Sequence, residues 1–166
     1  MVEFVKPPRA LVDKTGRGTP GAGDRLIKKA DEAVKQHQGR VDYRVIAGAS
    51  LDKLNELMRQ FATDPASHQA IAKKIYELCH DLKGEGASFG YPAVSRCADL
   101  ICRVIDCEAQ RDKRFLEIVK VEVESIRAMI RYDVKGNPRG VALEIIDALE
   151  FLVDNFLDKM KAAEAA

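Results

Sequence analysis

One histidine, His80, stands among residues whose types and spacing suit chemistry on an imidazole nitrogen. Lys83 follows three residues later, and the small residues Gly84 and Ala87 come next. A neutral imidazole offers a lone pair to an electrophile such as a phosphoryl group, and an ammonium one helical turn away can neutralise an anion beside it. Glycine inside a helix costs about 1 kcal/mol relative to alanine, so Gly84 suggests that a bare surface is needed. The segment predicts an exposed nucleophile that another macromolecule can approach.

The helix that carries this histidine is expected to begin at Asp64-Pro65, because a capping side chain followed by proline is a typical helix start. At about 100° per residue, the apolar residues of the segment lie roughly 140 to 220° around the helix from His80. The histidine should therefore point away from the core. These apolar residues are Ile71, Ile75, Leu78, Leu82 and Phe89.

Several other residues share the exposed side with His80. Four of them lie within about 40° of it, and Lys83 lies about 60° away. We interpret the four as partner-facing and Lys83 as the electrostatic helper of the histidine. Each would be an ordinary surface residue by itself, and Gly84 alone would equally suit a kink or close helix packing. The four partner-facing residues are Lys73, Tyr76, Gly84 and Ala87.

The remaining sequence predicts an all-α protein. Residues 1–23, rich in proline and glycine, predict a flexible leader, and 24–49 predict a short helix and a connector. Residues 50–162 predict an antiparallel helical bundle with short connections, and 163–166 a tail.

Within the bundle, Ser50 can cap the first helix, whose apolar stripe runs from Leu51 to Phe61. After the histidine helix, a third is expected from Pro92 to Cys107. A fourth should start at Asp112 and end at Gly136, and a fifth should follow Asn137-Pro138. The inward-facing residues expected in this last helix are Val141, Ile145, Leu149, Leu152, Phe156 and Met160.

Composition excludes several classes of function. The 166 residues include 27 basic and 26 acidic side chains, so the net charge of +1 provides no broad field for nucleic acid or an anionic membrane. No stretch approaches the ~20 apolar residues of a membrane span, and the start lacks the apolar region of a signal peptide. The four cysteines are separated by 18, 5 and 5 residues, which matches no common zinc spacing. We expect a cytoplasmic protein with reduced thiols and no metal site.

The motif around the histidine resembles a known signature. His80, Leu82, Lys83 and Gly84, with a further glycine at Gly90, are similar to the pattern of histidine-containing phosphotransfer (HPt) domains and of the related phosphorylated domain of chemotaxis-type histidine kinases. The resemblance covers about residues 51–132. It implies an antiparallel four-helix bundle with additional N-terminal and C-terminal helices. It also implies that His80 is the phosphoacceptor, through Nε2, and that Lys83 stabilises the phosphate.

The same resemblance implies how the protein works. The phosphoryl group would pass to and from aspartates of response-regulator receiver domains, and hybrid or sensor histidine kinases would be further partners in a two-component phosphorelay. Mg²⁺ is expected on the receiver, with no cofactor on this chain. The sequence has no GxxxxGK[ST] loop for ATP, so we expect a phosphotransfer intermediate without autokinase activity. The resemblance also implies a monomer.

Asp81 and Glu85 place negative charge beside the motif, and Glu85 departs from the family pattern, in which this position is small and uncharged. One interpretation is that both carboxylates are solvated on the helix surface and repel each other mildly. The other is that they select receivers with a basic rim.

Two alternative functions remain. The chain would be a non-catalytic helical interaction module if the motif is a chance match. It would be the phosphoacceptor domain of a chemotaxis-type histidine kinase if its donor is a kinase domain. Only the second would form an acid-labile phosphohistidine.

Overall fold

The computed structural model describes residues 25, 27–29, 32, 42–107 and 113–164. The chain divides into two compact units, 1–42 and 43–166. In the first unit, residues 25, 27–29 and 32 are helical. The expected leader, most of residues 24–41 of the expected helix and connector, and the end of the tail lie outside the described residues.

Every regular element of the second unit is helical, as the sequence predicts. Its five α-helices and one short 3-10 helix follow one another with no strand in the described part of the chain. No helix there is both long and apolar enough to cross a membrane. The elements are α3 (Tyr43–Thr63), η1 (Pro65–Ser67), α4 (His68–Ser88), α5 (Pro92–Asp106), α6 (Lys113–Arg131) and α7 (Val141–Glu164).

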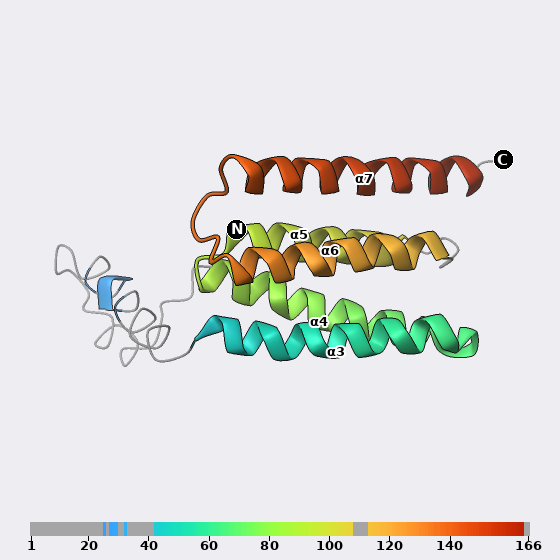
Figure 1. Ribbon diagram of the computed structural model, residues 1–166, viewed down its shortest axis with the longest axis horizontal. Coiled ribbons are helices and arrows are strands. Elements are labelled where there is room, and N and C mark those ends of the chain that lie inside the picture. Colours follow the sequence, from blue (N-terminus) through green and yellow to red (C-terminus); the bar gives the residue numbers. More distant parts are fainter. Residues whose placement is uncertain (1–24, 26, 30–31, 33–41, 108–112, 165–166) are drawn as a thin grey trace, which may run out of the picture. The chain divides into compact units, whose positions relative to one another are not determined.

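The helices pack in a closed order around one core. α4 packs against α3 and α5, α6 packs against α5 and α3, and α7 rests on α5 and α6. The chain reverses direction between α3 and α4 and again between α6 and α7 (Figure 1). Their buried stripes meet in a single apolar cluster, and its largest fully buried aliphatic side chains include Leu51, Leu54, Ile75, Leu82, Ile101 and Ile126.

The start of the histidine helix matches the sequence prediction closely. The Asp64 carboxylate accepts a hydrogen bond of 3.2 Å from the Ala66 amide, and Pro65 opens η1, which leads directly into α4. His68, the first residue of α4, stacks on Phe61 with ring centroids 3.8 Å apart. Its Nε2 lies 2.8 Å from the Phe61 carbonyl oxygen, so this histidine is a packing residue.

The first helix begins earlier than predicted. We expected a connector up to residue 49 and a cap at Ser50, but α3 starts at Tyr43. The polar–apolar alternation around Tyr43 and Val45 misled the interpretation, because Val45 is 72% exposed whereas Tyr43 is buried. Tyr43 and Ala47 extend the buried stripe that continues at Leu51, which explains why the helix includes them.

The end of α6 and the buried face of α7 also differ from expectation. α6 ends at Arg131, five residues before Gly136, because Asp133 turns the chain with a φ of +52°. In α7 the residues buried against the bundle are Ile146, Leu149 and Val153. Of the residues predicted to face inward, Leu149 is buried and Phe156 packs against the core, whereas Val141, Ile145 and Leu152 are 69%, 37% and 40% exposed.

Candidate functional site

His80 lies on the solvent-exposed face of α4. Its neighbours Cys79 and Leu82 are fully buried, so the helix turns the imidazole away from the core, as the apolar spacing predicts. The ring of Tyr76, one turn earlier, lies nearly parallel to the imidazole at a centroid distance of 6.2 Å. The nitrogen atoms therefore belong to the surface, where a partner can reach them.

Lys83 stands one turn after His80 and is engaged with the next helix. Its Nζ donates to Oδ1 of Asp99 on α5 at 2.5 Å, and both side chains are about half exposed, at 49% and 42%. The hydrogen bond to Asp99 and the charge of that carboxylate raise the pKa of Lys83 above its ordinary value. The ammonium is thus charged and anchored to α5, on a residue one helical turn after the histidine.

Two glycines near the histidine have different roles. A Cβ built at exposed Gly84 would meet no neighbouring atom within 4 Å in the described part of the chain. A Cβ at buried Gly86 would lie 2.9 Å from Ser95 Oγ and 3.2 Å from the Tyr91 carbonyl oxygen. Gly86 is therefore needed for close packing of α4 on α5, and Gly84 is not. Ala87 is exposed like Gly84, so both leave open space beside His80.

The contact of α4 with α5 is reinforced by hydrogen bonds. Ser95 Oγ donates to the Lys83 carbonyl oxygen at 2.7 Å. After α4, Gly90 adopts a φ of +81°, a conformation that glycine takes without strain, and the Tyr91 amide donates to the Gly86 carbonyl at 2.7 Å. Gly90 thus serves the turn that brings α5 back along the histidine helix.

Aromatic side chains support this end of the bundle. Tyr43 stacks on Phe89 with centroids 5.0 Å apart and lies 5.1 Å from Tyr91. The Tyr91 hydroxyl donates to Asp133, and the Lys135 ammonium lies 5.2 Å above the Tyr91 ring. The aromatic residues that flank the motif are therefore structural supports.

The two acidic residues beside the histidine differ in their environment. Asp81 is exposed. Glu85 is partly buried, and burial together with the charge of Asp81 raises the pKa of its carboxyl. Its Oε2 is buried without a hydrogen-bond partner among the described residues. Glu85 is thus poorly solvated, which the interpretation of two solvated carboxylates did not anticipate.

Lys73 and Tyr76 extend the same face toward the start of α4. Both line a hollow between α4 and α5 together with Ala70 and Ile105. The predicted partner-facing residues therefore share one continuous face with His80. Among the described residues, no cluster of three or more histidine, cysteine or carboxylate side chains could hold a metal ion.

Sequence reasoning missed Asp99, Ser95 and Gly86. All three act between α4 and α5, and a single sequence does not reveal which residues of two helices come opposite each other. Gly86 could have indicated this contact from the sequence, because a glycine inside a helix often marks close packing. Gly84 and Gly86 lie two residues apart and face different sides of the helix, so they need separate explanations.

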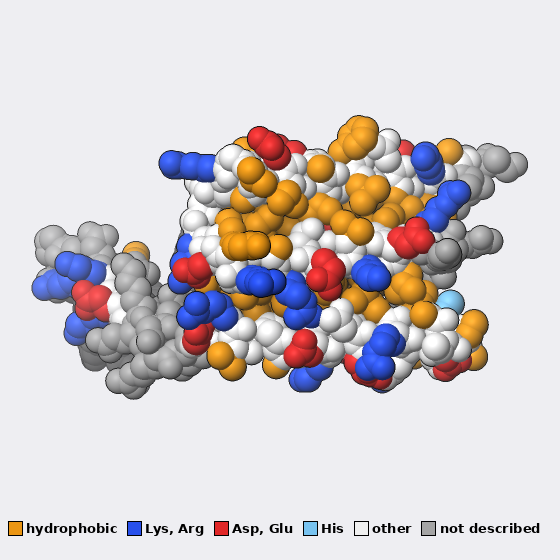
Figure 2. All heavy atoms as spheres, in the orientation of Figure 1, with side chains coloured by type: hydrophobic (Ala, Val, Ile, Leu, Met, Phe, Trp, Pro, Cys, Tyr) orange, Lys and Arg blue, Asp and Glu red, His pale blue; other side chains and the backbone are white. Residues whose placement is uncertain are grey.

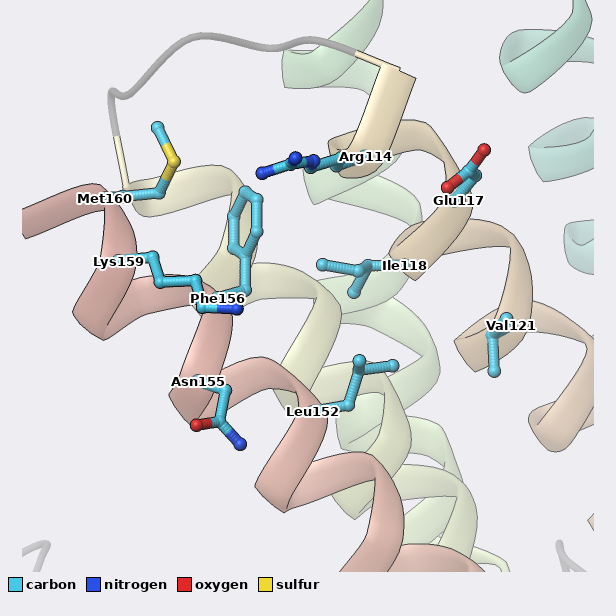
Figure 3. A pocket seen from close by; sticks show the side chains of 9 residues that line it. All are labelled: Arg114, Glu117, Ile118, Val121, Leu152, Asn155, Phe156, Lys159 and Met160. Atoms are coloured by element: carbon cyan, nitrogen blue, oxygen red, sulfur yellow. The ribbon is translucent and has the colours of Figure 1, made fainter. Parts of the chain in front are cut away.

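A second surface feature lies away from the histidine. A groove of about 430 Å³ runs between α6 and α7, and side chains from both helices point into it (Figure 3). Ile118 and Val121 line it from α6, and Leu152 and Phe156 line it from α7. Among the described residues that line the groove there is no histidine and no cysteine, and the charged side chains of Arg114, Glu117 and Lys159 lie at it beside the apolar ones.

Comparison with known proteins adds little. No family profile and no solved structure matches the chain. A tRNA dimethylallyltransferase of Chlorobaculum parvum is 25% identical over 150 residues, which cover 85% of this chain and 47% of that protein. The chain thus spans about half the length of this curated relative.

Proposed function

We propose that this protein is a histidine phosphotransfer protein that carries a phosphoryl group on His80, between aspartates of receiver domains in a two-component phosphorelay. The observation that carries the proposal is an exposed imidazole on a helix, with a charged ammonium one turn away and two small, exposed residues next to it. The arrangement provides a nucleophile, a counter-charge and clearance for a partner, which together suit exchange of an anionic group between proteins.

The transfer step uses the lone pair of the imidazole. Nε2 of His80 attacks phosphorus, and the P–O bond to the receiver's aspartate breaks with its electron pair returning to the carboxylate. The ring keeps its Nδ1 proton, so charge is conserved. Phosphoryl transfer depends mainly on positioning and charge neutralisation, and Lys83 would counter the charge of the phosphoryl group and orient it once it is bound to His80. Mg²⁺ and the acidic pocket would come from the receiver.

The fold supports the proposal at a coarser level. We propose that α3, α4, α5 and α6 form an antiparallel four-helix bundle of the HPt type, to which α7 is added. Each of the four contacts two others in a closed order, and the histidine lies on the second. A monomer in the cytoplasm, working without a cofactor of its own, completes the proposal.

The activity named for the curated relative is less well supported. Transfer to tRNA calls for a basic surface, whereas the net charge of this chain is +1. The two other candidates are an interaction module and the phosphoacceptor domain of a kinase. Both would use the same exposed face, the first for binding alone and the second to accept a phosphoryl group from a kinase domain.

A direct test is phosphoryl exchange with receiver domains. The protein is incubated with a panel of phosphorylated receivers and Mg²⁺, and acid-labile, base-stable phosphate on the protein is measured by intact mass. We expect the wild-type protein to become phosphorylated and His80→Gln to accept none. Glu77→Gln, at another exposed position of α4, is the matched control and should behave as wild type.

The result separates the candidates. Phosphorylation of His80→Gln at the wild-type level would exclude His80 as the carrier, and circular dichroism checks that the variant is folded. If no receiver phosphorylates the wild-type protein, the relay proposal fails. Phosphorylation only by a kinase domain with ATP would favour the kinase phosphoacceptor domain.

A further inference from the structure

Lys83 shows an arrangement that its expected role does not explain. The sequence assigns its ammonium to a phosphate on His80, yet that ammonium is bound to Asp99 on α5 at 2.5 Å. About half of each side chain is exposed, so water and other anions can reach the pair. An anion added beside the imidazole would therefore compete with Asp99 for the same cation.

The place of Asp99 is fixed by the packing beneath it. The backbones of α4 and α5 approach closely at Gly86, where a side chain would meet Ser95. The Ser95 hydroxyl donates to the Lys83 carbonyl oxygen at 2.7 Å. Asp99 follows Ser95 by one helical turn on the same side of α5, which brings its carboxylate beside Lys83. The pair thus follows from the register of the two helices.

We propose that Asp99 is a positioning residue that competes with the phosphoryl group on His80 for the Lys83 ammonium, and so limits the lifetime of the phosphohistidine. This inference rests on the proposed phosphotransfer function. In the free protein Asp99 holds Lys83 charged and in place. In the phosphorylated protein the ammonium is divided between the carboxylate and the phosphoryl oxygens.

The chemistry gives the direction of the effect. In hydrolysis, water supplies an oxygen to phosphorus while the P–N bond breaks and its electron pair returns to Nε2. The phosphoryl charge becomes more dispersed in the loose transition state than in the phosphohistidine. An ammonium bound to the phosphoryl oxygens therefore stabilises the starting state more, and slows the loss. Asp99 weakens that protection by holding the ammonium and by adding a negative charge nearby.

The test uses phosphohistidine that is made chemically, so that no receiver is needed. Phosphoramidate donates its phosphoryl group to the imidazole, and its amino group leaves as ammonia. The decay of phosphorylated His80 is then followed by mass spectrometry of the intact and digested protein. We expect Asp99→Asn to lengthen the half-life about two- to fivefold, the range of an exposed ion pair. Lys83→Ala should shorten it, and Asp99→Glu should restore nearly the wild-type value.

Two controls separate this mechanism from a structural effect. In the Lys83→Ala background, Asp99→Asn should have a much smaller effect, because the contested cation is gone. Asp154→Asn removes an ion pair of similar length and exposure, in which Arg103 of α5 binds Asp154 of α7 at 2.6 Å. That variant should leave the half-life unchanged. High salt should reduce the difference between Asp99→Asn and wild type.

Equal half-lives for Asp99→Asn and the wild-type protein would overturn the inference. So would an effect of the same size in the Lys83→Ala background. These outcomes are independent of the proposed function, which fails separately if no receiver exchanges phosphate with His80. A slower decay in Asp99→Asn together with exchange by the wild-type protein supports both.

Discussion

Two faces of the bundle differ in how their helices pack: the face formed by α4 and α5, and the face formed by α6 and α7. On the first, the helices touch closely at Gly86, and polar groups span the contact above it. On the second, apolar side chains remain uncovered, and Figure 2 shows hydrophobic side chains gathered along the seam between α6 and α7. The exposed ones include Val121, Ile145, Phe151 and Leu152.

This difference bears on what the proposed transfer site would require. A nucleophile must sit on a rigid surface that is open above and closely packed below, and the first face provides both through Gly84 and Gly86. The second face exposes apolar side chains such as Val121 and Leu152, and the described residues that line its groove include no histidine or cysteine. An exposed apolar surface indicates contact with another molecule. A reaction, by contrast, needs a nucleophile such as the imidazole together with a nearby opposite charge.

The largest expected effect concerns Glu122, a buried residue between the two faces, whose ionisation should change the free energy of unfolding. It lies on α6, is fully buried, and neither carboxyl oxygen has a hydrogen-bond partner among the described residues. Its charge acts on Cys79 of α4 and Cys97 of α5, and Glu150 of α7 acts on it. Burial raises the pKa of Glu122 from 4.5 to about 8, and the charge of Glu150 makes a smaller contribution in the same direction.

The raised pKa makes stability depend on pH. Between pH 4.5 and about 8 the folded protein keeps the Glu122 proton that the unfolded chain has released, so the free energy of unfolding should fall as pH rises through this window. Glu122→Gln keeps the neutral shape and removes the titration. Urea unfolding should show similar stability for both proteins at low pH and a gain for Glu122→Gln of a few kcal/mol, on the order of 1.4 per pKa unit, above pH 8.

Parallel pH profiles for Glu122→Gln and wild type would contradict this account, because they would mean that the Glu122 carboxyl reaches water in the folded state. Glu117→Gln, at an exposed position of the same helix, is the control. It should leave the profile close to that of the wild-type protein.

The two glycines of α4 provide a smaller but cleaner contrast. Gly86→Ala should lower the free energy of unfolding by about 1–3 kcal/mol, because its Cβ would lie 2.9 Å from Ser95 Oγ and 3.2 Å from backbone atoms. Gly84→Ala, the matched control, should raise it by about 0.5–1 kcal/mol, since alanine favours the helix and meets no neighbour. Denaturant unfolding measures both. Equal effects would show that α4 and α5 are not closely packed at Gly86.

The sequence predicted features that depend on one helix at a time. The orientation of His80 followed from the apolar spacing of its own helix, and the Asp64 cap followed from two adjacent residues. Local geometry determines each of these, so periodicity and capping rules are sufficient.

Features that depend on two helices were not predictable. The pairing of Lys83 with Asp99 joins residues 16 positions apart, and their meeting depends on the register of α4 against α5. The buried face of α7 was predicted only in part, for the same reason: Leu149 is buried as expected, whereas Val141 is exposed. Its sequence is apolar on more than one side, and only contact with α5 and α6 selects Ile146, Leu149 and Val153 for burial.

The smallest expected effect tests the uncovered face itself. Phe151 is 72% exposed on α7, so Phe151→Ser should change the free energy of unfolding by less than about 0.5 kcal/mol and leave the proposed phosphoryl exchange at His80 unchanged. Val153→Ala, two residues away and fully buried, is the matched control and should cost about 2 kcal/mol. Both are measured by urea unfolding. A loss of more than 1 kcal/mol for Phe151→Ser would mean that this ring is covered in solution. The face formed by α6 and α7 would then be packed like the face formed by α4 and α5, and the contrast between the two faces would disappear.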